Sequence, residues 1–202
     1  LRRAAFDGWR VGYWSLNEDY AIAQLETRVL RLLDSLPPEI RPRYRRRGTL
    51  VEFPDSGGFI RVFPATQSGG TSYTFDLVDF DEFALHQYGA ANLEHVQPTV
   101  SGGGQLILNS TSNPTLGPNG AFYDIWLASQ DGGEAAFEVG DLQPVFLPWE
   151  VRPGRDAAWL ERQRRQFRGL GDHAFRAFYP TTWPEAFIGR SGLVFPQFDR
   201  EL

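Results

Sequence analysis

Several residue types are absent from this chain of 202 residues, and each absence excludes a class of chemistry. No cysteine occurs, which excludes disulfide bonds, cysteine-ligated zinc and thiol catalysis. No run of about 18 apolar residues occurs, so the sequence holds no candidate membrane-spanning helix. Lysine and methionine are also missing, so all 20 basic residues are arginines. The histidines, His86, His95 and His173, are scattered, which argues against a histidine-rich metal site.

The remaining composition is that of a folded domain. Hydrophobic residues make up 42% of the chain, enough for a sizeable core and too many for a disordered segment. The formal net charge of −5 argues against a globally basic nucleic-acid-binding protein, although it leaves room for a local basic patch. The first residues carry charge without an apolar stretch behind it, so we do not expect them to act as a signal peptide. We expect one α/β domain with a small appendage.

The most informative stretch is 75–82, where an apolar run ends at the adjacent carboxylates Asp81 and Glu82. A short apolar run of this kind is typical of a buried strand in a parallel sheet, and ligands bind beyond the carboxyl ends of such strands. At that position Asp81 would hold Mg²⁺ and Glu82 would orient an attacking water during nucleotide hydrolysis. The alternative is a strand that simply ends in a solvated acidic turn, and Asp76 and Asp79 within the run favour that interpretation.

A second apolar stretch, 105–111, ends in Asn109, Ser110 and Thr111. Neighbouring parallel strands end side by side, so these amide and hydroxyl groups could sense the γ-phosphate of a nucleotide held near Asp81. The alternative is that they only cap the strand end and begin a turn, as these residue types often do.

Between the two ends of the chain, periodicity and turn residues predict the other elements. Asn17 is expected to cap a helix over 18–36, and Gly8 to end a helix over 1–7. The other expected strands are 9–15, a hairpin of 49–53 with 59–64, 145–147 and 191–196. The other expected helices are 121–129, 156–170, 172–178 and one beginning at Thr182.

Five arginines crowd into seven residues at 41–47. One interpretation is a solvated basic loop. The other is a contact with phosphates of a nucleic-acid backbone, made by Arg43, Arg45, Arg46 and Arg47.

Taken in order, these motifs resemble the large subunit of tailed-phage terminases, the ATP-driven motor that packages DNA. The resemblance covers nearly the whole chain. It rests on the strand before Asn17-Glu18, Asp81-Glu82 as a Walker B motif, 106–111, Phe122-Tyr123-Asp124-Ile125-Trp126, 179–187 and Gly192-Leu193-Val194-Phe195.

The resemblance implies a P-loop NTPase of the ASCE (RecA-like) class. Its mostly parallel sheet, flanked by helices, would form the ATPase core over 1–150. A helical lid would follow over 151–190, and a nuclease domain would begin at 191–202. In this family Asp81 would be the Mg²⁺ aspartate, Glu82 the catalytic glutamate and Asn109-Ser110-Thr111 the coupling motif. The implied cofactors are ATP and Mg²⁺. The implied partners are double-stranded DNA, a portal protein, a small terminase subunit and further copies in a ring, with no membrane, in the host cytoplasm.

Two departures from the family pattern stand out. No phosphate-binding loop occurs, and by family order it would lie just before Leu1, on a strand expected beside 75–82. We therefore expect the chain alone neither to bind nor to hydrolyse ATP. The family also often carries a trans-acting arginine ahead of Walker B; residues 68–71 contain none, which leaves Arg61 or the arginines at 41–47 as substitutes.

Other functions stay open at this point. One is a different ASCE ATPase, such as a helicase-like enzyme. Another is a non-enzymatic binding module, which would present Trp126, Trp149 and Trp183 together on an exposed face. A third is a fragment with no activity of its own.

Overall fold

The computed structural model describes residues 1–66, 70, 72–113, 115–130 and 142–188. The chain divides into two compact units, Leu1–Ser110 and Thr111–Leu202. Each is described by itself below. The division falls earlier than residue 150, where the ATPase core is expected to end, and the functional boundaries at 150 and 190 stay predictions. The strand expected at 191–196 lies outside the described residues.

The first unit is built on a six-stranded sheet in the order β2-β3-β4-β1-β5-β6. Its strands are β1 (Arg10–Ser15), β2 (Arg45–Arg47), β3 (Leu50–Phe53), β4 (Gly58–Pro64), β5 (Phe75–Asp81) and β6 (Val100–Asn109). Four of them, β4, β1, β5 and β6, run parallel, whereas β2 and β3 are joined to β4 as antiparallel hairpins. The predicted mostly parallel α/β sheet is therefore confirmed, and so is the hairpin of 49–53 with 59–64.

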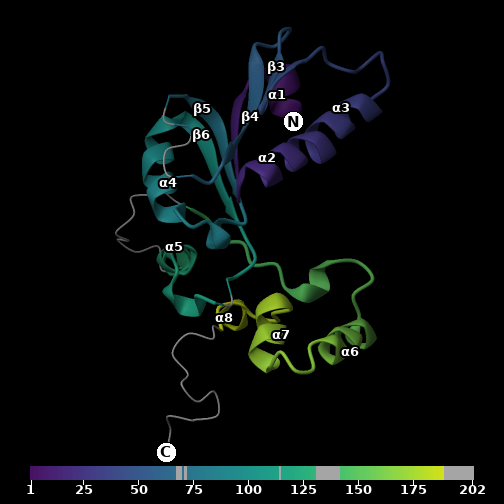
Figure 1. Cartoon of the computed structure of the whole chain (residues 1–202), viewed down its shortest axis with the longest axis vertical. Helices are drawn as coiled ribbons and strands as arrows, with labels where there is room; N and C mark the ends of the chain where they lie inside the picture. Colours follow the sequence, from purple (N-terminus) through teal and green to yellow (C-terminus); the bar gives the residue numbers. More distant parts are fainter. Residues whose placement is uncertain (67–69, 71, 114, 131–141, 189–202) are drawn as a thin grey trace, which may run out of the picture. The chain divides into compact units, whose positions relative to one another are not determined.

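Helices cover both faces of this sheet, as Figure 1 shows: α1 (Arg2–Asp7), α2 (Glu18–Gln24) and α3 (Arg31–Ser35) on one side, α4 (Gly89–Val96) on the other. The side chain of Asn17 accepts the Tyr20 N–H at 3.0 Å, so the expected cap begins α2. A π-helical segment, Leu25–Leu30, joins α2 to α3. The helix expected over 18–36 is therefore present, but its middle is wider than an α-helix. Gly8, with φ 75°, ends α1 as predicted.

Two apolar layers result from the alternation of side chains along the strands. On the α2 face, Val11, Ile60 and Val62 pack with Ala21 and Leu25. The α4 face is aromatic instead. The Trp14 ring stacks on Phe63 and Phe80, with ring centroids 4.5 and 5.0 Å apart, and the edge of Phe75 meets it at 5.5 Å. Both edges of β1 and β5 are paired with other strands, so these two strands form the centre of the sheet.

The second unit is helical. It contains α5 (Ala121–Gln130), α6 (Ala157–Gln166), α7 (Asp172–Phe178) and α8 (Trp183–Ala186), with short 3₁₀ turns at Gly117–Asn119 and Trp149–Val151. Asp156 caps α6, and Thr182 with Glu185 forms a capping box on α8. Rings hold the unit together; for example, Trp159 meets Tyr179 at 5.3 Å. None of the helices described in this structure combines the length and apolar character that crossing a bilayer requires.

Two expectations for the second unit are wrong. Residues 145–147 form no strand, and Val145 and Leu147 are 71% and 68% exposed. Their β-propensity is not sufficient, because a strand needs a neighbour to receive its backbone hydrogen bonds. The helix expected over 156–170 ends at Gln166, since Gly169 and Gly171 adopt left-handed backbone angles, φ 100° and 88°, that a helix cannot contain.

Candidate active site

The predicted carboxylates lie where the central strand β5 ends. Asp81 is the last residue of β5, and Glu82 follows in the left-handed conformation with φ 56°. Among the residues that the structure describes, Glu82 is the one non-glycine residue with positive φ. This conformation costs an L-residue about 1 kcal/mol or more, and it ends the strand abruptly before the 3₁₀ turn Phe83–Leu85. Both carboxylates were correctly predicted to lie at a strand end, but nothing in the sequence indicated the strained turn.

Ser110 lies beside Glu82, because β6 ends next to β5. Asp81 and Asn109 are paired in register, so Ser110 follows one step beyond. The Ser110 hydroxyl accepts the Ala84 N–H at 3.1 Å and donates to a Glu82 carboxylate oxygen at 3.4 Å. The structure thus brings together Glu82 and Ser110, two side chains that were selected from separate stretches of sequence.

Asn109 and Thr111 are placed differently from Ser110. The Asn109 side-chain amide donates to an Asp79 carboxylate oxygen at 2.7 Å, so Asn109 points to the α2 face of the sheet. Thr111 is the first residue of the second unit. Asn109 and Ser110 therefore do not face one point, and Ser110 contacts Glu82.

Asp81 is held by Tyr13, a residue that was not among the predicted site residues. Tyr13 lies on β1 opposite Asp79, and its hydroxyl donates to Asp81 Oδ2. Burial and this hydrogen bond raise the pKa of Tyr13 far above its usual value, so the phenol stays protonated and remains a donor. Tyr13 lies two residues after Val11 and therefore on the same face of β1, which is the sequence feature that could have identified it. That feature becomes useful only once the register between β1 and β5 is known.

Asp79 completes a pair of carboxylates on the α2 face of β5. Burial raises the pKa of Asp79 to about 6, and the nearby Asp81 carboxylate adds to the rise, while the hydrogen bond from Asn109 opposes it. In the sequence Asp79 only interrupts the apolar run. In the structure it is a half-buried acid whose ionisation is coupled to that of Asp81.

His86 supports the same strand end from the other face. Its Nε2 donates to the backbone carbonyl of Asp81 at 2.8 Å, and its ring lies near Phe80 and Phe83. Burial lowers the pKa of His86, so the ring stays neutral with the proton on Nε2. The sequence assigned no role to His86, because the three histidines are scattered along the chain. In the structure it holds the backbone at Asp81 in place.

The site fits Mg²⁺ only in part. Asp81 offers a carboxylate, and Mg²⁺ takes one or two protein carboxylates, several waters and the phosphates of a nucleotide. Within the described ranges, no group of three or more His, Asp or Glu side chains is arranged to hold a metal ion. The donor set thus suits a metal that arrives with a nucleotide, and does not suit a metal bound by protein alone.

The phosphate-loop strand cannot lie beside β5, where we expected it. Both edges of β5 are already paired, one with β1 and the other with β6. Among the described residues, β6 is instead the outer strand on this side of the sheet. Residues 67–69 and 71, in the loop ahead of β5, lie outside the described part of the chain.

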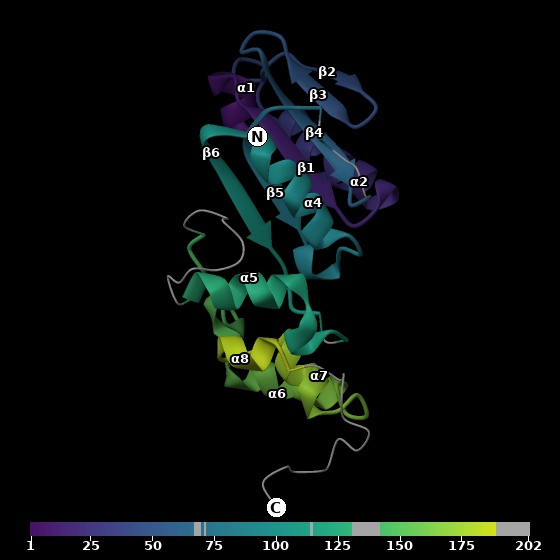
Figure 2. The same cartoon turned by 90° about the vertical axis from the view of Figure 1, so that its left-hand side faces the viewer.

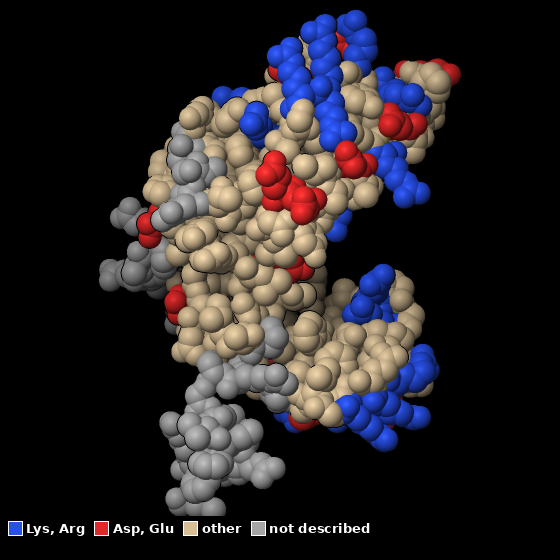
Figure 3. Space-filling view, in the orientation of Figure 1, with Lys and Arg blue, Asp and Glu red and all other residues tan. Residues whose placement is uncertain are grey.

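The arginine-rich segment is not a loop throughout, since Arg45–Arg47 forms the edge strand β2. Arginine side chains gather at this edge of the first unit (Figure 3). Several are engaged within the protein. Arg43 pairs with Asp55, Arg46 with Glu26 at 2.9 Å, and Arg47 with Glu52 at 3.4 Å.

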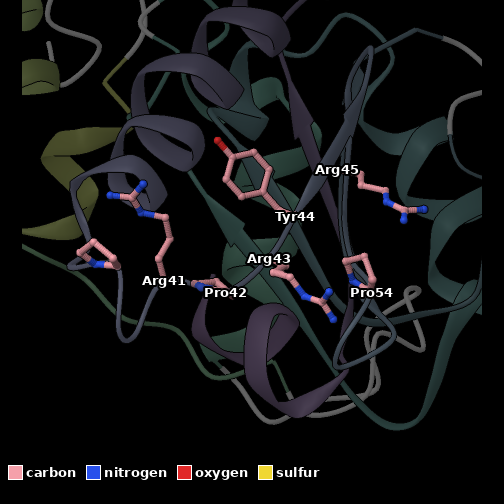
Figure 4. Close-up of a pocket in the computed structure, with 7 residues that line it drawn as sticks. Arg41, Pro42, Arg43, Tyr44, Arg45 and Pro54 are labelled. Atoms are coloured by element: carbon pink, nitrogen blue, oxygen red, sulfur yellow. The ribbon is translucent and has the colours of Figure 1, made fainter.

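A pocket of about 610 Å³ lies beside β2. Its lining residues are Pro38, Arg41, Pro42, Arg43, Tyr44, Arg45 and Pro54. Arg41 donates to the backbone carbonyls of Asp34 and Leu36 at the end of α3, so this arginine serves the fold. Tyr44 points away from Arg45 in Figure 4 and donates to Asp34 at 2.8 Å. All the lining residues lie between Pro38 and Pro54, and neither Asp81 nor Glu82 is among them.

Strand alternation sorts the arginines by face. Arg46 is opposite buried Val51 and reaches Glu26 of the π-helical segment, so it points to the helix-covered face. Arg45 and Arg47 therefore point to the other face. Arg61 on β4 joins them there, with its guanidinium 5.5 Å from the Phe63 ring and 5.3 Å from the Tyr73 ring. Figure 2 shows this face of β2, β3 and β4 without a helix in front of it.

No family model and no curated protein matches the sequence. Solved structures do match. The large terminase of a thermophilic bacteriophage aligns with 83% of this chain and 39% of its own, with a TM-score of 0.57 and 17% identity. A variant of the Thermus phage P74-26 large terminase ATPase domain aligns with 88% of this chain and 78% of its own, with a TM-score of 0.53 and 17% identity. The chain has the fold of a phage large terminase ATPase domain.

This terminase-like fold agrees with the predicted P-loop NTPase class. A structure of the first phage protein in complex with ADP aligns over the same shares of the two chains, with a TM-score of 0.54 and 17% identity. The chain spans about two fifths of that terminase, 39% of its length, so it corresponds to a part of such a protein. At this identity the likeness establishes the terminase fold and leaves the activity to be argued from the site.

Proposed function

We propose that this chain forms most of the ATPase domain of a phage large terminase, which powers the movement of double-stranded DNA into a procapsid. The observation that carries the proposal is the hydrogen bond between Ser110 and Glu82 at the ends of two adjacent parallel strands, next to Asp81. In a terminase-like fold these are the positions where a metal aspartate, a catalytic glutamate and a phosphate sensor would be needed.

Each residue of this group has a chemical task in the proposed reaction. Asp81 would hold Mg²⁺ and so help to hold the nucleotide phosphates. Glu82 orients the attacking water and accepts its proton. Ser110 donates a hydrogen bond to Glu82, so a movement of the end of β6 would also move the catalytic carboxylate. Bound Mg²⁺ would supply charge neutralisation on the phosphates.

The phosphates also need donors that this chain does not supply. P-loop enzymes hold the β- and γ-phosphates with backbone N–H groups and a lysine, and the sequence has neither a P-loop motif nor a lysine. Within the proposal, the outer edge of β6 is the place where a phosphate-loop strand would pair. ATP and Mg²⁺ are the proposed cofactors, a proposal supported by the solved terminase complexes with ADP and ATP-gamma-S.

Glu82→Gln in the complete protein tests the catalytic assignment. We expect ATP binding to persist and hydrolysis to fall by about 100-fold or more, because an amide cannot accept the proton of the attacking water. Glu94→Gln on α4 is the matched control, since Glu94 is exposed and is expected to leave turnover unchanged. Turnover near that of the parent protein in Glu82→Gln would overturn the assignment.

Calorimetric titration with Mg-ATP tests whether nucleotide binding needs the phosphate loop. The 202-residue chain is expected not to bind, while a version extended through a phosphate loop binds. Micromolar binding by the short chain would place the nucleotide elsewhere on the molecule.

The proposed partners are double-stranded DNA, a portal protein, a small terminase subunit and further copies of the motor in a ring, working in the host cytoplasm. The helix-free face that carries Arg45, Arg47 and Arg61 is the DNA surface that the geometry supports best. Arg46 is less suited to it, because its side chain points to the helix-covered face and pairs with Glu26. Arg43 precedes strand β2 and pairs with Asp55, as Arg47 does with Glu52.

The alternative of a non-enzymatic binding module has less support. It requires three tryptophans on one exposed face, but each is half-buried. Trp149 stacks on Trp159 with ring centroids 6.1 Å apart, while Trp126 lies 6.3 Å from Trp183. These contacts are those of a packed helical unit. Another ASCE ATPase, such as a helicase-like enzyme, would use the same carboxylates in the same way.

A further inference from the structure

Tyr13 contacts the proposed metal aspartate but has no part in the hydrolysis proposed above. Its ring packs against the core cluster formed by Val11, Ala21 and Leu25, and its hydroxyl donates to Asp81 Oδ2. The register pairs Tyr13 with Asp79, so the side chain reaches one step along β5 towards the carboxyl end of the strand. The ring of Tyr13 is thus part of the core, while its hydroxyl contacts the proposed metal site.

Asp79 and Asp81 lie on the same face of β5, and each receives a donor from a different neighbour. Asn109 on β6 donates to Asp79 at 2.7 Å, whereas Tyr13 on β1 donates to Asp81. Two carboxylates this close repel each other, and rotation about χ2 of aspartate is soft. Without a fixed donor, Asp81 would turn away from Asp79. The two donors hold the carboxylates apart and in defined orientations.

We propose that Tyr13 is a positioning residue that fixes the orientation of the Asp81 carboxylate for Mg²⁺–nucleotide. The phenol engages Oδ2, so Oδ1 is the oxygen left to face the metal or its water. Loss of a partner that orients a metal ligand typically costs about 10–100-fold in metal affinity. The inference rests on the proposed function, since it takes Asp81 to be the metal aspartate.

Tyr13→Phe separates the hydrogen bond from the packing, because phenylalanine keeps the ring in the core and removes only the hydroxyl. Tyr44→Phe is a matched control: Tyr44 also donates to an aspartate, Asp34, but at the end of α3. Tyr13→4-aminophenylalanine is the rescue variant, because its amino group restores a donor at the same place.

The measurement is Mn²⁺ binding to the complete protein with ATP-gamma-S, followed by electron paramagnetic resonance. Tyr13→Phe is expected to weaken Mn²⁺ binding roughly 10-fold, Tyr44→Phe to leave it unchanged, and the rescue variant to recover most of the loss. In steady-state kinetics the Mg²⁺ concentration for half-maximal turnover should rise for Tyr13→Phe, while kcat at saturating Mg²⁺ changes by less than about twofold.

The outcomes separate this inference from the proposed function. If Asp81→Asn weakens Mn²⁺ binding while Tyr13→Phe does not, Tyr13 has only a packing role and the inference is overturned. If Asp81→Asn also has no effect, the proposed metal site itself is wrong. A Tyr13→Phe protein that fails to fold, judged by its thermal unfolding against Tyr44→Phe, assigns the hydroxyl to stability and equally overturns the inference.

Discussion

The two halves of the first unit's sheet differ in how they are covered and in what they carry. The parallel half, from β4 through β1 and β5 to β6, has helices on both faces at its centre and places carboxylates at the carboxyl ends of its strands. In the antiparallel half, β2 and β3 with β4, one face is covered and the other carries arginines. The parallel half thus joins distant segments into a site, whereas the antiparallel half presents a local hairpin surface.

The largest expected effect is on the buried centre of the parallel half. Phe80 is fully buried and stacks on Trp14, so Phe80→Ala should lower the free energy of unfolding by about 3–5 kcal/mol. Leu50→Ala on β3 is the matched change in the antiparallel half, and we expect it to cost about 1 kcal/mol because Leu50 is only partly buried. Urea denaturation measures both. Equal losses would mean that the two halves contribute equally to stability.

The next effect concerns the end of β6. Ser110→Ala combined with Thr111→Ala should disturb DNA translocation more than nucleotide affinity, with roughly 1 kcal/mol lost per neutral hydrogen bond. The single change Ser110→Ala should carry most of the effect, because Ser110 is the residue in contact with Glu82. Packaging rate and ATP affinity, measured on the same preparations, test this. Equal packaging rates in the double variant and the parent would leave Ser110 and Thr111 as strand-end residues only.

A smaller effect is expected on the arginine face. Replacing Arg45 and Arg47 with glutamine should lower the slope of log affinity for DNA against log salt by about two, one for each lost phosphate contact. The same replacement of Arg43 and Arg46 should change the slope less, because Arg46 points to the helix-covered face and Arg43 lies outside strand β2. If all four replacements together leave the slope unchanged, the arginine-rich strand has no role in DNA binding.

The smallest effect is on stability at the same surface. Arg43 and Asp55 form an exposed ion pair, and such pairs contribute little because water and salt screen them. Arg43→Ala should therefore leave the free energy of unfolding close to that of the parent protein. A large loss of stability in urea denaturation would show that the antiparallel half depends on this pair.

Much of the parallel half could be predicted from the sequence because its signals are local. The apolar run before Asp81 and the cap at Asn17 each depend on a few consecutive residues. The rule that ligands bind beyond the carboxyl ends of parallel strands then placed Asp81, Glu82 and Ser110 near one another.

What could not be predicted depends on register and on neighbours. Tyr13 and Asp79 meet the site only because β1 pairs with β5 in one particular register. Arg45 and Arg46 point to opposite faces only because the segment is a strand, and arginine itself has no strong strand preference. The segment 145–147 has the composition of a strand but no partner in the described part of its unit. These are properties of pairs of segments, which no single stretch of sequence contains.

The left-handed backbone at Glu82 has a consequence for how this chain can evolve. Glycine would adopt φ 56° without strain, so Glu82→Gly should remove a cost of about 1 kcal/mol, partly offset by glycine's greater freedom in the unfolded chain. The change would also remove the Ser110–Glu82 hydrogen bond. Under the proposed function, a requirement for the carboxylate is what would keep a strained residue at this position. A domain that no longer needed the carboxylate could therefore accept glycine here without backbone strain.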